Sequence, residues 1–437
     1  MKRILVLGAG LVSRPLVRYL TDRKDFEVTV ATRTVKKAEA LVSDRPNGKA
    51  IAFNATDTDT LEELVKQHDL AVSLLPATEH VKVAKCCLRN NKHMTTTSYI
   101  SKEMQALHED AKAQGLTFLN ECGVDPGIDH MSAMRVIHEA EKKGGKIISF
   151  RSYCGGLPAP EANNNPIGYK FSWAPRGVLV AATNDAKYLE NGKTVAIPGN
   201  ELFKSPETVT IPDVGVFEGY PNRDSLPYAD MYGLKDVKTM YRGTLRNTGH
   251  CEAWYHWVNW GLFNTHDRSD LGNLTYRRFM QGFADGAGNI PLGLAKKAGI
   301  EESSPAITNL DWLGLFDDSI IPLTSGGNID VMATRMLERC SFGPGERDMI
   351  AMQHEFVIEY PKQTTEKIYS TIVDFGIPKG DSSMARTVSL PLGIGTRMIL
   401  DGTLSERGIV APIKPDVYNP ILDELAELGI TCTERTA

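Results

Sequence analysis

Cysteine is scarce in this sequence, with seven residues in a chain of 437. The seven are odd in number, scattered along the chain and never arranged in a C-x-x-C spacing. Secreted disulfide frameworks and zinc sites both need regularly spaced cysteines. The sequence therefore predicts neither structural disulfides nor a metal site.

Long apolar runs are also missing. The longest stretches, such as residues 70–76, fall far short of the ~20 residues that cross a bilayer. The apolar run after Met1 stops at Gly8, and no small-residue cleavage site follows at the distance of a signal peptide. We therefore expect a cytoplasmic protein with no membrane partner.

An excess of positive charge is the third absence. The 49 basic and 54 acidic residues are interleaved and give a formal net charge of -5. Such a chain presents no cationic field for a phosphate backbone. Nucleic acid is not expected as a partner.

What the sequence does contain is typical of a globular protein. Hydrophobic residues make up 42% and charged residues 24%, which is enough to bury large cores. The length suggests roughly two or three domains at about 150 residues each.

In the first 120 residues, predicted strands alternate with predicted helices. The strands are expected near residues 3–7, 27–31, 50–54, 70–75, 93–97 and 116–121. This alternation is typical of a doubly wound parallel α/β sheet. Ligands of such sheets bind beyond the carboxyl ends of the strands.

The first strand runs into a glycine turn, Gly8-Ala9-Gly10, followed by a helical pattern. In a dinucleotide-binding turn the first glycine permits the bend and the second lets the backbone approach the pyrophosphate. Ser13 stands where the third glycine is usual, so the motif alone also fits a plain β-turn.

The second predicted strand ends at Thr32-Arg33-Thr34. An acidic residue here would bind a ribose 2′-hydroxyl, whereas a guanidinium pairs with a 2′-phosphate. Arg33 therefore favours NADP over NAD, the alternative being a solvated arginine at a strand end.

The pattern changes after about residue 125, where a second domain is predicted to begin. Residues 152–173 are expected to form a long loop, either a binding loop or a structural crossover. Arg223 and Arg246 are also expected in loops, and two guanidinium groups suit a substrate with several carboxylates. Residues 250–263 predict a helix whose three tryptophans pack in a core or subunit contact.

The remaining third of the chain mixes helices and strands. Helices are expected near residues 274–283, 310–316, 331–340 and 384–400, and a hairpin near 352–360 and 367–375. A last helix is expected to end at Gly429, and its position suggests that the chain returns to the first domain.

A series of motifs in order along the chain resembles the saccharopine dehydrogenases, specifically the NADP-dependent, L-glutamate-forming saccharopine reductases. The motifs are residues 8–12 (GAGLV), 95–101 (TTTSYIS), 120–130 (NECGVDPGIDH), 152–161 (SYCGGLPAPE), 168–173 (GYKFSW), 220–225 (YPNRDS), 242–246 (RGTLR) and 400–403 (LDGT).

The resemblance implies a variant Rossmann fold, α/β, with a doubly wound parallel sheet. That dinucleotide-binding domain would span residues 1–125 and about 385–437. A second, mixed α/β substrate and dimerisation domain would span residues 126–245 and about 345–384, and a mainly helical insertion residues 246–344.

The resemblance also implies a reaction in lysine metabolism by the aminoadipate route. L-2-aminoadipate 6-semialdehyde condenses with L-glutamate to an imine, which NADPH reduces to saccharopine, and the reverse reaction restores both. A homodimer is expected.

Site residues are carried over by position. The resemblance places the cofactor at Gly8, Ala9, Gly10, Leu11, Val12, Thr32, Arg33, Thr34, Phe53, Asn54, Ser73, Thr96, Thr97, Gly123, Val124, Asp125 and Ala174, and the substrate at Ser98, Tyr99, Asp125, Arg223, Thr244, Leu245 and Arg246. Ala174 replaces a serine that is usual in the family, so no hydroxyl contact is expected from it. Asp125 and Tyr99 are the candidate catalytic residues.

The residues leave some choices open. The proton donor to the imine nitrogen could be Asp125, Tyr99 or water. The alternative functions are a related imine reductase, such as carboxynorspermidine dehydrogenase, and a Rossmann-fold binding protein without turnover. The physiological direction, lysine synthesis or breakdown, is also open.

Overall fold

The computed structural model describes residues 1–286, 288–361 and 364–437. The chain forms two compact units. Unit 1 comprises residues 1–145 and 372–435, and unit 2 comprises residues 146–371 and 436–437. The last long segment of the chain thus belongs with the first.

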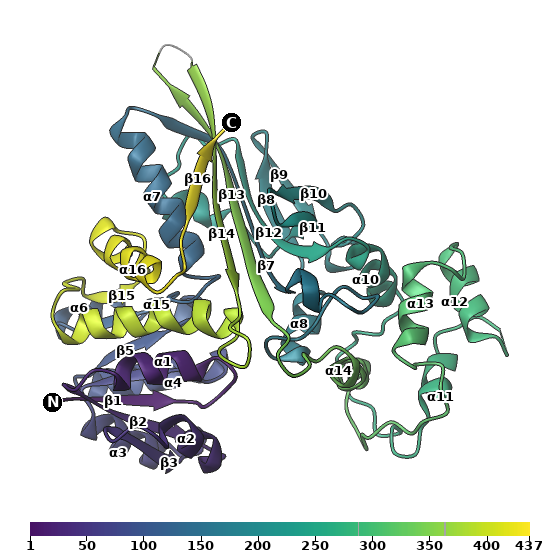
Figure 1. The fold of residues 1–437 in the computed structure, drawn as a ribbon, viewed down its shortest axis with the longest axis horizontal. Coiled ribbons are helices and arrows are strands. Elements are labelled where there is room, and N and C mark those ends of the chain that lie inside the picture. The colour runs from purple at the N-terminus through teal and green to yellow at the C-terminus, as the bar shows by residue number, and fades with distance from the viewer. Residues whose placement is uncertain (287, 362–363) are drawn as a thin grey trace. The chain divides into compact units, whose positions relative to one another are not determined.

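Within its described residues, unit 1 is built on a seven-stranded parallel sheet (Figure 1). The strand order is β15-β6-β5-β4-β1-β2-β3. The bounds are β1 (Lys2–Leu7), β2 (Phe26–Thr32), β3 (Gly48–Ala52), β4 (Leu70–Ser73), β5 (His93–Thr96), β6 (Thr117–Leu119) and β15 (Gly408–Val410). The order reverses between β1 and β4, which is where a doubly wound sheet binds its ligand. The predicted α/β fold class is confirmed.

The helices of unit 1 precede or follow these strands along the chain. They are α1 (Ser13–Thr21), α2 (Val35–Val42), α3 (Thr58–Gln67), α4 (Ala77–Arg89), α5 (Lys102–Gln105), α6 (His108–Ala113), α7 (Ile128–Lys142), α15 (Ser383–Leu400) and α16 (Pro415–Glu427). On one face, α15 packs beside α1 (Figure 1). Gly393 permits this approach, because a Cβ there would lie 2.8 Å from the Tyr19 ring.

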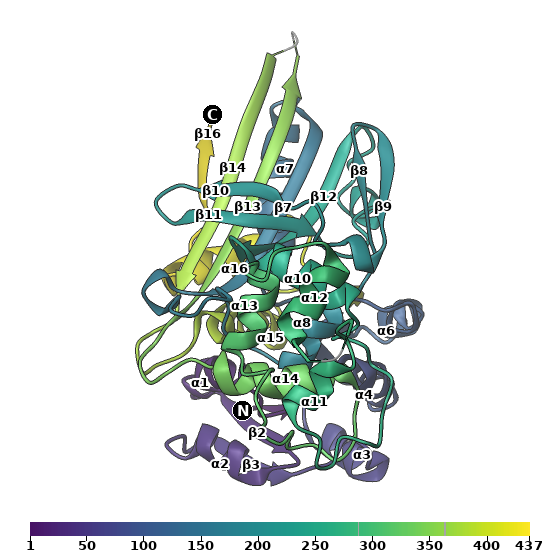
Figure 2. The same ribbon diagram turned by 90° about the vertical axis from the view of Figure 1, so that its right-hand side faces the viewer.

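A second, mixed sheet is nine-stranded in the described residues and consists mainly of unit 2, although residues 372–375 and 433–435 of its strands belong to unit 1. Its main path is β10-β11-β12-β7-β13-β14-β16, and β8 and β9 branch from β12. The bounds are β7 (Lys146–Pro158), β8 (Ala186–Glu190), β9 (Lys193–Ile197), β10 (Glu207–Ile211), β11 (Gly215–Pro221), β12 (Thr239–Asn247), β13 (Asp348–Tyr360), β14 (Thr364–Phe375) and β16 (Thr433–Thr436). Figure 2 shows β13 and β14 as long neighbouring arrows, so the predicted hairpin is confirmed.

The predicted loop at residues 152–173 is wrong in its first part, because β7 continues to Pro158. Glycine and proline suggested a loop, yet Gly155 lies inside the strand. A Cβ at Gly155 would lie 2.7 Å from the carbonyl oxygen of Leu245 on β12. The glycine therefore marks a close backbone approach within the sheet rather than a break in it.

Helices form the rest of unit 2. They are α8 (Pro175–Ala181), α9 (Pro227–Met231), α10 (His250–Asn259), α11 (Tyr276–Gln281), α12 (Ile290–Ala298), α13 (Pro305–Trp312) and α14 (Asn328–Arg339), with short 3-10 turns at Pro160–Ala162 and Gly199–Glu201. Trp254 and Trp257 of α10 are buried, and the Trp257 indole donates to the Ala306 carbonyl at 2.8 Å. The tryptophan stripe packs in a core, as predicted.

Among the described residues, no helix is both long enough and apolar enough to cross a bilayer.

Candidate active site

The glycine turn joins β1 to α1 and depends on two different properties of glycine. Gly8 has φ +112°, and a Cβ there would lie 2.9 Å from the Leu74 carbonyl oxygen. At Gly10, by contrast, a Cβ would meet no atom within 4 Å. Gly8 is needed for the fold of the turn, and Gly10 leaves the outer side of the turn open to a ligand.

Ser13 explains the departure from the usual third glycine. Its hydroxyl accepts a hydrogen bond from the Gly10 amide at 2.9 Å and lies 3.4 Å from the Gly8 carbonyl oxygen. The Ser13 side chain therefore stabilises the turn by hydrogen bonds to its backbone. Leu11 is exposed at the tip, and Ala9 and Val12 are half-buried.

The residues after β2 form the second part of the predicted cofactor site. Arg33 and Thr34 are exposed, and the Arg33 guanidinium has no hydrogen bond or ion pair with any described residue. Phe53 is buried, and its ring lies in the core of unit 1. Asn54 beside it is exposed.

The carboxyl ends of β4 and β5 bring three predicted residues together around a fourth that the sequence analysis missed. His80, in the first turn of α4, lies with Nδ1 2.8 Å from Ser73 Oγ and Nε2 2.7 Å from Ser98 Oγ. Thr96 Oγ1 is 3.4 Å from the same Nε2. Thr97 follows Thr96 and is half-buried.

Burial lowers the pKa of His80 to about 4. The imidazole is therefore neutral near pH 7, and one ring nitrogen donates while the other accepts. The only sequence signal for His80 was its place in the first turn after β4, opposite two hydroxyl-rich strand ends.

The two candidate catalytic residues are in contact. The Tyr99 hydroxyl donates to Asp125 Oδ1 at 3.1 Å. Tyr99 follows β5 and Asp125 follows β6, and these strands are neighbours in the sheet. A phenol and a carboxylate at this edge can bind an ammonium group and transfer a proton.

The loop that carries Asp125 is held by buried polar contacts. Glu121 accepts from the Ile100 amide at 2.8 Å, and its other oxygen lies 2.8 Å from His130 Nε2. Gly127 has φ +150°, and a Cβ there would lie 2.1 Å from the Gly123 carbonyl oxygen. Gly123 and Gly127 thus close the loop around Val124 and Asp125, a geometry that larger residues would prevent.

In unit 2, Thr244, Leu245 and Arg246 lie in β12 and not in a loop as predicted. Strand β12 pairs with β7 on one side and β11 on the other, so its backbone is held at both edges. Leu245 is buried, and Thr244 is half-buried.

Arg246 is a buried cation without a carboxylate partner in the described part of the chain. Its side chain is only 7% exposed, and its guanidinium carbon lies 5.0 Å from the centre of the Tyr169 ring. Nη1 donates to the Leu245 carbonyl at 2.8 Å, while Nε has no partner. Buried charges are normally paired, so this arginine is suited to an anionic ligand.

Arg223 lies elsewhere in unit 2, in the turn after β11. It is exposed, has φ +56°, and its carbonyl accepts from the Lys187 amide at 2.8 Å. Its side chain lines a hollow of about 350 Å³ together with Trp173 and Arg176. Ala174, the position where the family usually has serine, is exposed at the start of α8.

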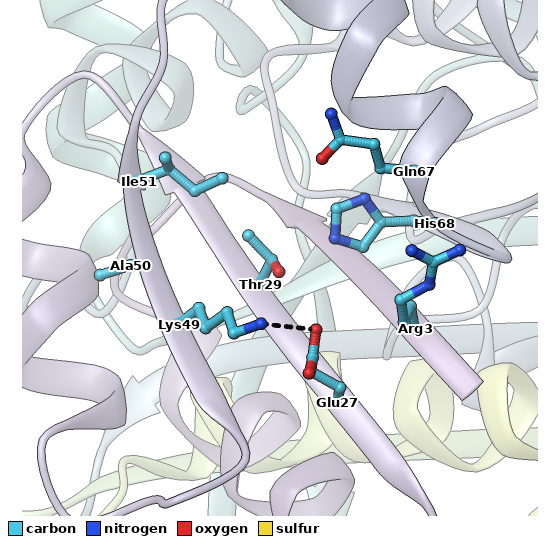
Figure 3. A pocket seen from close by; sticks show the side chains of 8 residues that line it. All are labelled: Arg3, Glu27, Thr29, Lys49, Ala50, Ile51, Gln67 and His68. Atoms are coloured by element: carbon cyan, nitrogen blue, oxygen red, sulfur yellow. Dashed lines mark hydrogen bonds and ion pairs between the residues drawn. The ribbon is translucent and has the colours of Figure 1, made fainter. Parts of the chain in front are cut away.

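A larger hollow, of about 470 Å³, lies over β1, β2 and β3 (Figure 3). Its lining includes Arg3, Thr29, His68 and the ion pair between Lys49 and Glu27, whose charged atoms are 2.9 Å apart. Arg3, Glu27 and Lys49 stand near the amino ends of their strands. The predicted cofactor residues stand at the carboxyl ends, so size alone does not identify the active site.

Two family models match the chain. One, described as "Saccharopine dehydrogenase NADP binding domain", matches residues 4–119. A second, "Saccharopine dehydrogenase C-terminal domain", matches residues 123–430. Together the two models cover nearly the whole chain.

Two fungal relatives match over nearly their full length. Saccharopine dehydrogenase [NADP(+), L-glutamate-forming] of Schizosaccharomyces pombe is 41% identical and that of Saccharomyces cerevisiae 38%, each over 100% of this chain and 99% of the relative. Mitochondrial alpha-aminoadipic semialdehyde synthase of Bos taurus is 36% identical over 100% of this chain and 48% of its own.

A solved structure, the apo saccharopine dehydrogenase (L-Glu forming) of Saccharomyces cerevisiae, has the same fold. It superposes with a TM-score of 0.91 at 37% identity, covering 100% of both chains. By its sequence, its fold and the order of its motifs, the chain belongs to the saccharopine dehydrogenase family.

Proposed function

We propose that the chain is an NADP-dependent, L-glutamate-forming saccharopine dehydrogenase. It would reduce the imine of L-2-aminoadipate 6-semialdehyde and L-glutamate to saccharopine, and catalyse the reverse oxidation. The observation that carries the proposal is the full-length match, at 41% and 38% identity, to two fungal enzymes of that name.

The residues of unit 1 fit NADP. Gly10 leaves the turn open beside the first turn of α1, where amide groups and the helix dipole favour a pyrophosphate. Arg33 is an exposed guanidinium without a competing partner in the described residues, so it can pair with a 2′-phosphate. When bound, the nicotinamide supplies or accepts the hydride.

The substrate is a multiply charged anion, and unit 2 provides matching cations. Saccharopine has three carboxylates, and Arg246 is a buried guanidinium that lacks a carboxylate partner among the described residues. A bound carboxylate would satisfy Nε and compensate the buried charge. Arg223, on the exposed turn, is the second carboxylate ligand in this proposal.

Tyr99 and Asp125 would act on the amino nitrogen. The Asp125 carboxylate attracts an ammonium or iminium group, and the Tyr99 hydroxyl fixes one of its oxygens. In the reductive direction a proton must reach the nitrogen, and in the oxidative direction it must leave. We assign this transfer to the Tyr99–Asp125 pair.

The location and assembly of the protein are part of the proposal. We place it in the cytoplasm as a homodimer. Size-exclusion chromatography with light scattering tests the dimer, and fractionation of the source cells tests the location.

The experiment that tests the function is oxidation of saccharopine, followed by the absorbance of the reduced nicotinamide with NADP⁺ and with NAD⁺. We expect turnover with NADP⁺ and a much lower kcat/KM with NAD⁺. Carboxynorspermidine serves as the competing substrate. Turnover of that amine alone, or tight NADPH binding without turnover of either, would overturn the proposal.

A further inference from the structure

His80 contacts two serines that the family resemblance assigns to different ligands, Ser73 to the cofactor and Ser98 to the substrate. Ser73 ends β4 on the cofactor side, and Ser98 follows β5 on the substrate side. The imidazole lies between them, 2.8 Å from one hydroxyl and 2.7 Å from the other. Its side chain is 4% exposed, so water does not compete for these contacts.

The chemistry of a neutral imidazole makes the two contacts interdependent. One ring nitrogen carries the proton, so one serine must donate to the ring while the other accepts from it. Turning the Ser73 hydroxyl toward a ligand changes which nitrogen is protonated. That change in turn reverses the direction of the Ser98 hydroxyl.

Two other histidines of unit 1, the buried His68 and the half-buried His93, have a different arrangement. His68 contacts the Leu64 carbonyl through Nδ1, and His93 accepts from the Thr117 amide. Backbone groups have a fixed role as donor or acceptor, so such contacts only hold structure. Hydroxyl groups can reverse, and His80 has three of them around it, with Thr96 as the third.

We propose that His80 is a positioning residue that couples the cofactor site to the substrate site through the hydroxyls of Ser73 and Ser98. The inference rests on the proposed function, because the family resemblance behind that function places the cofactor at Ser73 and the substrate at Ser98. Binding of NADPH sets the direction of the Ser73 hydroxyl, and His80 passes this choice to Ser98. The coupling is reciprocal, so saccharopine raises the affinity for NADPH by the same factor.

The test is calorimetric titration of the complete protein with saccharopine, in the absence and presence of saturating NADPH. Saccharopine and NADPH are both reduced, so no hydride transfer can occur between them. The titration therefore measures equilibrium affinities. We expect NADPH to tighten saccharopine binding about threefold to tenfold in the unaltered protein, the range of one redirected hydrogen bond.

Three variants separate the two contacts. His80→Asn places an amide near the position of Nδ1 and His80→Gln near that of Nε2, while His80→Leu removes both contacts. All three should bring the coupling factor to about one. His80→Asn should keep the original affinity for NADPH measured without saccharopine. His80→Gln should keep the original affinity for saccharopine measured without NADPH.

His93→Asn is the matched control, because it makes the same substitution in unit 1 at a histidine whose contact is the Thr117 backbone amide. The coupling factor should stay at its original value. A coupling factor of one in the unaltered protein, coupling that survives in folded His80→Gln and His80→Asn, or an equal loss in His93→Asn would each overturn the inference. Failure of the proposed function is seen separately, as the absence of saccharopine oxidation by the unaltered protein.

Discussion

Tyr99 donates a hydrogen bond to Asp125 across 3.1 Å, although the two residues are 26 positions apart in the chain. Two neighbouring parallel strands, β5 and β6, bring them to the same edge of the sheet. The two candidate catalytic residues, which the sequence suggested separately, are thus hydrogen-bonded to each other and can act together. Loss of this contact should therefore affect turnover more than binding.

We expect Asp125→Asn to lower kcat/KM for saccharopine about hundredfold and Tyr99→Phe about tenfold, because general acid–base groups contribute on this scale. The double variant should lose little more than Asp125→Asn, since both residues serve one step. Steady-state kinetics with NADP⁺ measure these effects.

Tyr418→Phe is the matched control, because its hydroxyl contacts His138 and not Asp125. It should retain full activity. Equal losses in Tyr418→Phe, or full additivity in the double variant, would contradict a joint catalytic role.

The preference for NADP should depend on Arg33. Arg33→Asp replaces a guanidinium by a carboxylate, which repels a 2′-phosphate and can bind a ribose 2′-hydroxyl. The ratio of kcat/KM for NADP⁺ to that for NAD⁺ should fall roughly tenfold to hundredfold. Lys37→Asp, the same type of charge change on exposed α2, should move the ratio far less. An unchanged ratio in Arg33→Asp would show that the 2′-phosphate is bound elsewhere.

The sequence predicted unit 1 well because its signals are local. Strand patterns, the Gly8 turn and the position of Arg33 can each be recognised within a few residues. In unit 2 the same reasoning misread β7, because Gly155 serves contact with Leu245, about ninety positions away, and no local pattern reveals this.

Candidate site residues at the ends of strands could be named from the sequence. A residue that reaches the site from a helix was missed. Ser73, Thr96 and Ser98 could be found from the strand pattern. His80 could not, because its role depends on the rotation of α4 over β4 and β5. The contact of Glu121 with His130 was missed for a similar reason, since only the closed loop brings these two side chains together.

Arg246 should be needed for substrate binding and not for stability. Arg246→Met removes a buried charge that has no carboxylate partner in the described residues, so the free energy of unfolding should stay the same or rise by up to about 2 kcal/mol. The KM for saccharopine should rise roughly tenfold to hundredfold, the range of a charged hydrogen bond. Urea unfolding and steady-state kinetics measure the two effects.

Arg386→Met is the control, because Arg386, unlike Arg246, has a carboxylate partner among the described residues. Its guanidinium lies 2.7 Å from the buried carboxylate of Asp374, so the substitution should cost about 3 kcal/mol of stability. If Arg246→Met destabilised the protein as much as Arg386→Met, Arg246 would be a structural residue.

The buried state of His80 predicts how stability depends on pH. Its pKa is about 4 in the folded protein, against an ordinary value of 6.5, and burial is the cause. Between these two values the unfolded chain binds a proton that the folded chain does not. Stability therefore falls as pH drops from 6.5 toward 4, and His80 contributes about 2 kcal/mol of loss between pH 7.5 and pH 5.

The measurement compares urea unfolding of the unaltered protein and of His80→Asn at both pH values. The variant should lose about 2 kcal/mol less than the unaltered protein, because asparagine does not titrate. His68 and His93, whose pKa values burial also lowers, are present in both proteins and cancel in the difference. If the two proteins lost the same stability, the imidazole of His80 would be protonated in the fold as readily as in the unfolded chain. The neutral ring that links Ser73 to Ser98 would then not persist through the pH range in which the coupling is proposed.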